Sequence, residues 1–217
     1  MLWENIEILV NKPIISNIML YLNSSLNEGS HKEEAMGNHV ISRREDYEIS
    51  PFTFAIVPVE YGSKTYSKII EFDEEILVPF KPSAIIKTSC DYFGAGYPGR
   101  CNSTKVLLGI SHKVPISLEP GNRLFFFPTT SPAKESCIWL SYEHIVSRIK
   151  IDSTKTQINF RNKQSIVVPV SYSIIENQML RTAMLKSKLL QTLAETERKT
   201  NYLYNAIQVN DKKSNFQ

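Results

Sequence analysis

The feature that most restricts the fold is a change of hydrophobic period near residue 171. Before this point, short runs rich in β-branched and aromatic residues, such as residues 52–61 and 65–72, alternate with Gly, Pro and charged clusters, a pattern typical of β-strands. From residue 172 to 193 the apolar residues instead recur at helical spacing. The sequence therefore predicts a sheet-rich body followed by a long amphipathic helix.

The strand-like runs and one shorter helical run divide the body further. Pro82 opens a predicted short helix over residues 83–93, which ends at Gly94. Ser173 and Glu176 have the spacing of a capping box at the start of the long helix. The predicted strands are a meander at 52–61, 65–72 and 76–80, runs at 106–110, 116–118, 124–127 and 138–149, and a hairpin at 156–160 and 165–170. The expected class is α+β: a sheet-rich antiparallel body with one short helix and a long C-terminal amphipathic helix.

The two ends of the chain differ in composition from this body. In residues 1–46 acidic residues outnumber basic ones, and the stretch 24–38 (SSLNEGSHKEEAMGN) is polar and contains Gly and Ser, so we expect a flexible N-terminal extension. The run Lys32-Glu33-Glu34 requires purine-rich codons just before Met36, which suggests the alternative that translation starts at Met36. We place the folded domain at 47–196 and a flexible tail at 197–217.

Composition argues against a membrane protein and against a disulfide scaffold. No apolar run approaches the roughly 20 residues of a membrane span. Three cysteines at irregular spacing fit a reducing compartment, so we expect a cytoplasmic protein without a membrane partner.

The net charge of +3 conceals a strong asymmetry along the chain. Residues 81–113 hold five basic and one acidic residue, and residues 147–200 hold ten basic and four acidic residues. Residues 1–80 are acidic. If both basic segments share one face, they form a surface for nucleic-acid phosphates; the alternative is a scatter of solvated lysines.

The glycine-rich stretch from Gly94 to Arg100 is the sharpest local feature. We predict that it forms a thin arm, with Tyr97 free to stack and Arg100 able to enter a narrow A·T-rich minor groove. A phosphate cradle is disfavoured because no Walker ending follows, while a purely structural turn stays open. On the long helix, Arg181 and Lys188 lie seven residues apart and therefore share a face. The predicted DNA-binding residues are Tyr97, Arg100, Lys105, Lys113, Arg161, Arg181 and Lys188.

Catalysis has little support in the sequence. Cys90, Cys101 and Cys137 could pair with His112 or His144 as nucleophile and base, but no local signature of a thiol enzyme surrounds them. We expect buried structural cysteines, no metal site, no cofactor and no enzymatic activity.

Several blocks together resemble the competence transcription factor family, ComK. The most specific are SCDYFGAGYPGR at 89–100 and PVSYSIIENQMLRTAMLKSK at 169–188, and the others are YSKIIE (66–71), ISHKVPI (110–116), FFFPTTSP (125–132) and CIWLS (137–141). The resemblance runs in order from about residue 47 to residue 193, which makes 47–196 the DNA-binding domain.

The resemblance implies a transcriptional activator of bacterial genetic competence that acts in the cytoplasm, on the nucleoid. It implies binding to paired A/T-rich promoter boxes through the minor groove of double-stranded DNA, as a homo-oligomer (dimer or tetramer). It also implies control by an adaptor and a Clp-type protease. Because the C-terminal tail is shorter than expected for the family, a non-activating paralogue that works as a protein-interaction module is the alternative.

Overall fold

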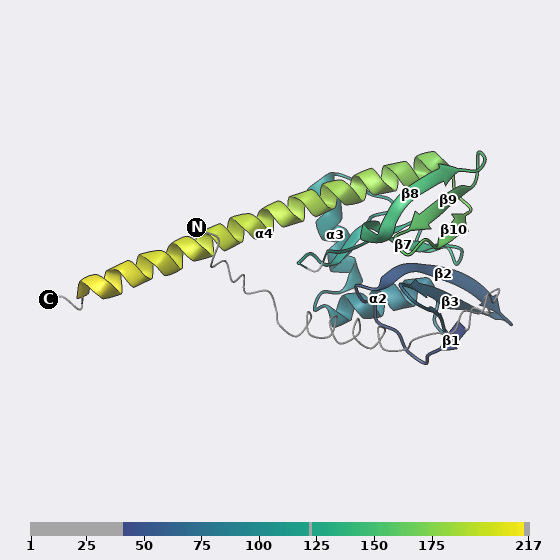
Figure 1. Ribbon diagram of the computed structural model, residues 1–217, viewed down its shortest axis with the longest axis horizontal. Helices are drawn as coiled ribbons and strands as arrows, with labels where there is room; N and C mark the ends of the chain where they lie inside the picture. Colours follow the sequence, from purple (N-terminus) through teal and green to yellow (C-terminus); the bar gives the residue numbers. More distant parts are fainter. Residues whose placement is uncertain (1–40, 122, 215–217) are drawn as a thin grey trace, which may run out of the picture. The chain divides into compact units, whose positions relative to one another are not determined.

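The computed structural model of the chain describes residues 41–121 and 123–214 (Figure 1). The expectations for residues 1–40, including the start at Met36, lie outside the described residues. In chain order the elements are β1 (Ile41–Arg43), β2 (Thr53–Tyr61), β3 (Lys64–Glu71), β4 (Glu75–Val78), α2 (Pro82–Tyr92), α3 (Tyr97–Leu108), β5 (Ile116–Glu119), β6 (Leu124–Pro128), β7 (Trp139–Ser141), the 3₁₀ turn η1 (Tyr142–His144), β8 (Ile145–Lys150), β9 (Thr156–Phe160), β10 (Ser165–Val168) and α4 (Tyr172–Ser214).

The strands form two sheets. One has seven strands in the order β1-β4-β3-β2-β7-β6-β5, and it is mixed because β1 runs parallel to β4 while the other pairs are antiparallel. The other has three antiparallel strands in the order β10-β9-β8. With α2, α3 and α4, this confirms the α+β class.

The seven-stranded sheet is buried on both faces, which explains its continuous apolar runs. Alternate residues of β6 point to opposite sides: Phe126 joins the core beneath α2 and α3, while Phe127 joins the core beneath the three-stranded sheet and the start of α4. Ile69 and Ile70 of β3 divide in the same way. The described unit therefore has three layers, with α2 and α3 on one face of the large sheet and the three-stranded sheet with α4 on the other.

Several sequence predictions agree with this structure. The meander is β2-β3-β4, the hairpin is β9-β10, and the short helix is α2. Residues 138–149, predicted as one strand, are divided by η1, because β7 pairs in the large sheet and β8 in the small one.

The predicted strand at 106–110 and the predicted flexible arm at 94–100 are both wrong, because Tyr97–Leu108 is a helix, α3. Pro98 stands in its first turn, and Gly109 ends it in the left-handed conformation (φ 66°) with its N–H bonded to the Lys105 carbonyl. Only Cys101 and Thr104 of α3 are fully buried, so the helix leaves almost no hydrophobic period in the sequence.

The ends of the ordered elements also differ from the predicted boundaries. β1 pairs with β4 inside the segment expected to be a flexible extension. α4 continues to Ser214, past the predicted end at 193, because no Gly or Pro interrupts residues 172–214. Glu176 forms no capping box and pairs with Arg148 of β8 instead.

Candidate nucleic-acid interface

Tyr97 opens α3 and belongs to the core. Its half-buried ring packs edge-on against Trp139, with 6.2 Å between the ring centroids. Burial raises the pKa of the Tyr97 hydroxyl, and a hydrogen bond to Cys101 raises it further. This ring packs α3 against the large sheet instead of extending into solvent.

Arg100 lies in the first turns of α3, and all three guanidinium nitrogens donate hydrogen bonds to backbone carbonyls. Nε donates to Ala95 (2.8 Å), Nη1 to Ser117 (2.5 Å) and Nη2 to Phe93 (2.9 Å). These bonds tie the loop between α2 and α3 to strand β5. The predicted arm that would carry Arg100 into a groove is therefore not formed, and the structure gives this arginine a role in the fold.

Four of the predicted residues lie where α4 passes α3 and the loop that follows it, and two of them donate hydrogen bonds from α4 to these segments. Arg181 Nη1 donates to the His112 carbonyl (3.2 Å), and Lys188 Nζ donates to the Leu107 carbonyl (2.5 Å) in the last turn of α3. A cation at that position compensates the partial negative charge of a helix C-terminus. The other two residues are Lys105, exposed on α3, and Lys113, half-buried in the loop that follows α3.

Gln178 fixes α4 against the same loop. Its side chain is 1% exposed, and its Nε2 donates both to the Lys113 carbonyl (3.0 Å) and to the Pro128 carbonyl (2.7 Å). These hydrogen bonds bring parts of the two basic segments side by side, an arrangement that the charge pattern left open beside a scatter of solvated lysines. Much of their contact nevertheless stabilises the packing of α4.

Arg161 lies apart from these four, in the turn between β9 and β10, and it is exposed. The same small sheet carries three exposed cations that the sequence reasoning did not select: Lys150, Lys155 and Lys163. Of the ion pairs among the described residues, none involves these four cations. The signal that could have found them is the hairpin itself, because Lys155 and Arg161 directly flank strand β9.

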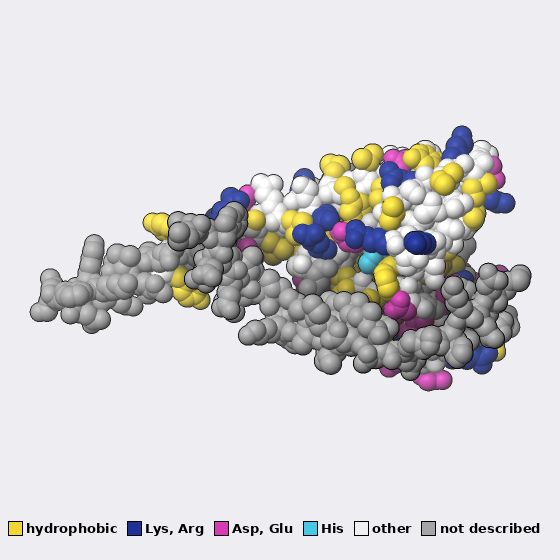
Figure 2. All heavy atoms as spheres, in the orientation of Figure 1, with side chains coloured by type: hydrophobic (Ala, Val, Ile, Leu, Met, Phe, Trp, Pro, Cys, Tyr) yellow, Lys and Arg dark blue, Asp and Glu magenta, His cyan; other side chains and the backbone are white. Residues whose placement is uncertain are grey.

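Lysine and arginine side chains gather over the part of the molecule that holds α3, the small sheet and the first half of α4 (Figure 2). The carboxylate beside Lys155 is occupied locally, because Asp152 Oδ1 accepts hydrogen bonds from the backbone N–H and the hydroxyl of Thr154. These bonds lower the pKa of Asp152. Lys150, Lys155, Arg161 and Lys163 are therefore exposed and form no salt bridge with the described residues, although Lys155 still attracts the Asp152 carboxylate.

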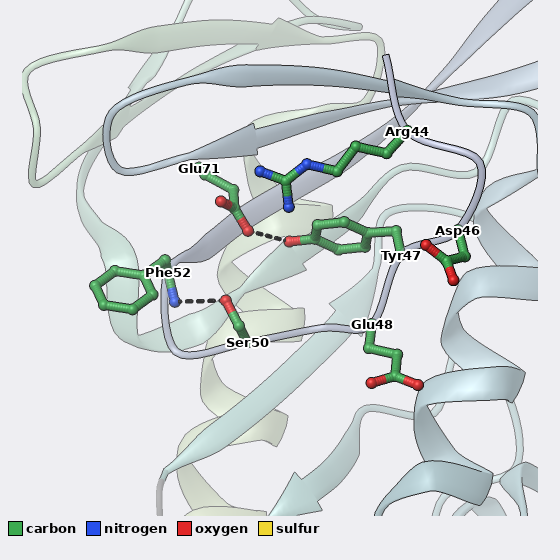
Figure 3. A pocket seen from close by; sticks show the side chains of 7 residues that line it. All are labelled: Arg44, Asp46, Tyr47, Glu48, Ser50, Phe52 and Glu71. Carbon is green, nitrogen blue, oxygen red and sulfur yellow. Dashed lines mark hydrogen bonds between the residues drawn. The ribbon is translucent and has the colours of Figure 1, made fainter. Parts of the chain in front are cut away.

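A shallow cavity of about 430 Å³ lies on the acidic side of the molecule, next to β3 (Figure 3). Asp46, Glu48 and Glu71 line it together with Arg44. Tyr47 Oη donates to Glu71 Oε1 (2.5 Å), and burial raises the pKa of this tyrosine. Three carboxylates repel phosphate, so this cavity is not a DNA-binding surface.

Among the described residues, the three cysteines form no catalytic arrangement with His112 or His144. Cys90, Cys101 and Cys137 are free and buried, as expected from the sequence. Burial raises the thiol pKa of Cys90 to about 12 and that of Cys137 to about 11, so neither is activated as a nucleophile. The ring of His144 stacks on Phe54 (4.1 Å between centroids).

Within the described ranges, no group of three or more His, Cys, Asp or Glu side chains has an arrangement that could hold a metal ion. Among the described helices, none has both the length and the hydropathy needed to cross a bilayer.

Comparison with known proteins gives a consistent result. Residues 44–194 match the family described as ComK protein. The chain is 40% identical over 144 residues to the competence transcription factor of Bacillus subtilis (strain 168), a match that covers 66% of this chain and 75% of that protein. No solved structure gives a significant match.

Proposed function

Because the chain belongs to the ComK family and is a competence transcription regulator, we propose that it binds A/T-rich promoter DNA and activates transcription there. The binding is to paired A/T-rich boxes, through the minor groove. The protein works without enzymatic chemistry, in the cytoplasm and on the nucleoid.

One observation carries the choice of DNA-binding surface: the exposed cations at both ends of the small sheet. Lys155 precedes β9 and Arg161 follows it, while Lys150 ends β8 and Lys163 lies in the turn between β9 and β10. Each cation that contacts a phosphate releases a condensed counterion, and this release is a major source of DNA affinity. The surface also lies on the opposite side of the large sheet from α2.

The partners follow from family membership in the same way. We propose a homo-oligomer, dimer or tetramer, and control by an adaptor and a Clp-type protease. Apolar residues exposed near the C-terminal end of α4 offer a surface for a second copy: Tyr202 is 75% exposed and Leu203 60%. Lys105, exposed on α3, would add a phosphate contact where α3 lies next to α4.

The test is the salt dependence of DNA binding by the full chain. Replacing both Lys155 and Arg161 by Ala should weaken binding to A/T-rich and G/C-rich duplexes alike, and it should reduce the slope of log K against log salt by about 2. Lys64→Ala is the matched control, because Lys64 is an exposed cation at the start of β3, in the large sheet.

Two results would count against the proposal. An unchanged slope in the Lys155/Arg161 variant would remove the small sheet from the phosphate-binding surface. Absence of any duplex binding by the wild-type chain would contradict DNA binding altogether. A reporter driven by a two-box promoter then separates an activator from a non-activating paralogue, because the paralogue would bind without raising expression.

A further inference from the structure

The outer face of the small sheet has an unusual composition. The inner face of β9 is fully buried: Thr156, Ile158 and Phe160 lie beneath the sheet. The residues that alternate with them, and their partners in register, form two cross-strand rows on the outer face: Ile149-Gln157-Val167 and Ser147-Asn159-Ser165. Each row places one amide side chain in the middle, on the central strand.

Hydrogen bonds join these amides into a ladder. Gln157 Nε2 donates to Asn159 Oδ1 (2.7 Å), and Asn159 Nδ2 donates to Ser147 Oγ (2.8 Å). Each amide nitrogen carries two hydrogens, so each keeps a second N–H, and the Ser147 hydroxyl keeps its own hydrogen. The ladder therefore offers a line of donors to a ligand above the sheet.

Apolar and charged groups surround the ladder. Ile149 is 52% exposed and Val167 53% exposed, on either side of Gln157. Along the central strand the sequence at alternate positions is Lys155, Gln157, Asn159, Arg161, which is a cation at each end and two amides between them.

We propose that this outer face reads the minor-groove edges of A·T base pairs, with Gln157 and Asn159 as the donors; the inference rests on the proposed function and names the site. Alternate residues of a strand are about 6.7 Å apart, which is close to two base-pair steps of about 3.4 Å. The distance from Lys155 to Arg161 is about 20 Å, so the row spans about six base pairs.

The chemistry of the groove explains a preference for A·T pairs. In the minor groove an A·T pair presents only acceptors, adenine N3 and thymine O2, whereas a G·C pair adds the guanine N2 amino donor. The acceptors of an A·T pair can bind a line of N–H donors, whereas the guanine N2 amino group places another donor against that line. β8 and β10 lie about 4.8 Å on either side of β9, so they are about 9.6 Å apart, wider than a minor groove of roughly 6 Å. Ile149 and Val167 would therefore contact the sugars along the two edges of the groove while the amides of β9 enter it.

The test measures base discrimination by the full chain on three duplexes of equal length. One carries a run of A·T pairs, the second has inosine·cytosine and the third guanine·cytosine at the same positions. An inosine·cytosine pair lacks the N2 amino group, so its minor groove resembles that of A·T while its major groove resembles that of G·C. We expect wild type to bind the first two alike and the third at least about tenfold more weakly.

The variants are Gln157→Ala and Asn159→Ala, with Gln191→Ala as the matched control, because Gln191 is an exposed amide on α4. Each sheet variant should reduce the A·T-over-G·C ratio about tenfold and leave the salt slope unchanged. A circular-dichroism melt confirms that each variant is folded. The control should keep the wild-type ratio.

The outcomes separate this inference from the proposed function. If both sheet variants keep the wild-type ratio, the ladder does not read bases, while DNA binding stands. If wild type binds inosine·cytosine as weakly as guanine·cytosine, the reading takes place in the major groove and the inference is wrong. If wild type binds none of the duplexes, the proposed function itself fails.

Discussion

Replacing Arg100 by Met tests the role that the structure gives this residue. Met keeps an unbranched apolar stem but removes the three donors that now reach the carbonyls of Ala95, Ser117 and Phe93. A buried hydrogen bond from a charged group contributes about 1.5–3 kcal/mol, and exposure reduces this. We assign about 1 kcal/mol to each of the two part-buried bonds and about 0.5 kcal/mol to the exposed one. The free energy of unfolding should therefore fall by about 2–3 kcal/mol.

The assay is urea unfolding followed by circular dichroism. Arg198→Met is the control, because Arg198 is exposed on α4, and it should change the free energy of unfolding by less than about 0.5 kcal/mol. At low temperature, where the variant is still folded, Arg100→Met should bind an A/T-rich duplex with wild-type affinity. The Arg100→Met variant thus distinguishes a role of Arg100 in the stability of the fold from a role in DNA binding.

The contrary result is equally clear. A variant as stable as wild type that binds DNA about tenfold more weakly would show that Arg100 contacts DNA, as the glycine-rich stretch first indicated. The three carbonyl bonds would then contribute nothing measurable to the fold.

Two further predictions concern buried titratable groups. Burial lowers the pKa of His144 below its ordinary value of 6.5, so the unfolded chain takes up a proton before the folded protein does as the pH falls. The free energy of unfolding should therefore decrease as the pH drops from about 7 towards 5. His144→Phe, which can still stack on Phe54, should make the free energy of unfolding less dependent on pH in this range, and an equally steep dependence would contradict the assignment. The thiols of Cys90, Cys101 and Cys137 are buried and their pKa values are raised. At pH 8 they should therefore react slowly with a disulfide reagent in buffer and rapidly in urea. Rapid reaction of the folded protein would contradict their burial.

The parts of the fold with a strong local pattern could be predicted from the sequence. The meander β2-β3-β4 and the hairpin β9-β10 show as β-branched runs between turns, and α4 shows as a helical period. Helix α3 could not be found in this way, because it buries little and its three neighbouring glycines resemble a loop. Its start depends on Pro98 and its end on Gly109, which are single residues instead of a repeating signal.

The candidate site was predicted only in outline. Charge along the chain showed two basic segments but left open whether they share one face; in the structure they are in contact where α4 passes the end of α3. It could not show that Arg181 and Lys188 would use their donors on backbone carbonyls. Nor could it show that Lys155 belongs with Arg161, because that depends on which residues flank the central strand of the small sheet.

The contacts of α4 with the loops beside it have a mechanical consequence. Gln178, Arg181 and Lys188 each donate to a fixed backbone carbonyl, at points spread over about 15 Å of helix axis. A slide of α4 along its axis would break all of these bonds at once. A force applied to the C-terminal end of α4 would therefore move the rest of the folded domain together with the helix, because these bonds prevent α4 from sliding along its axis.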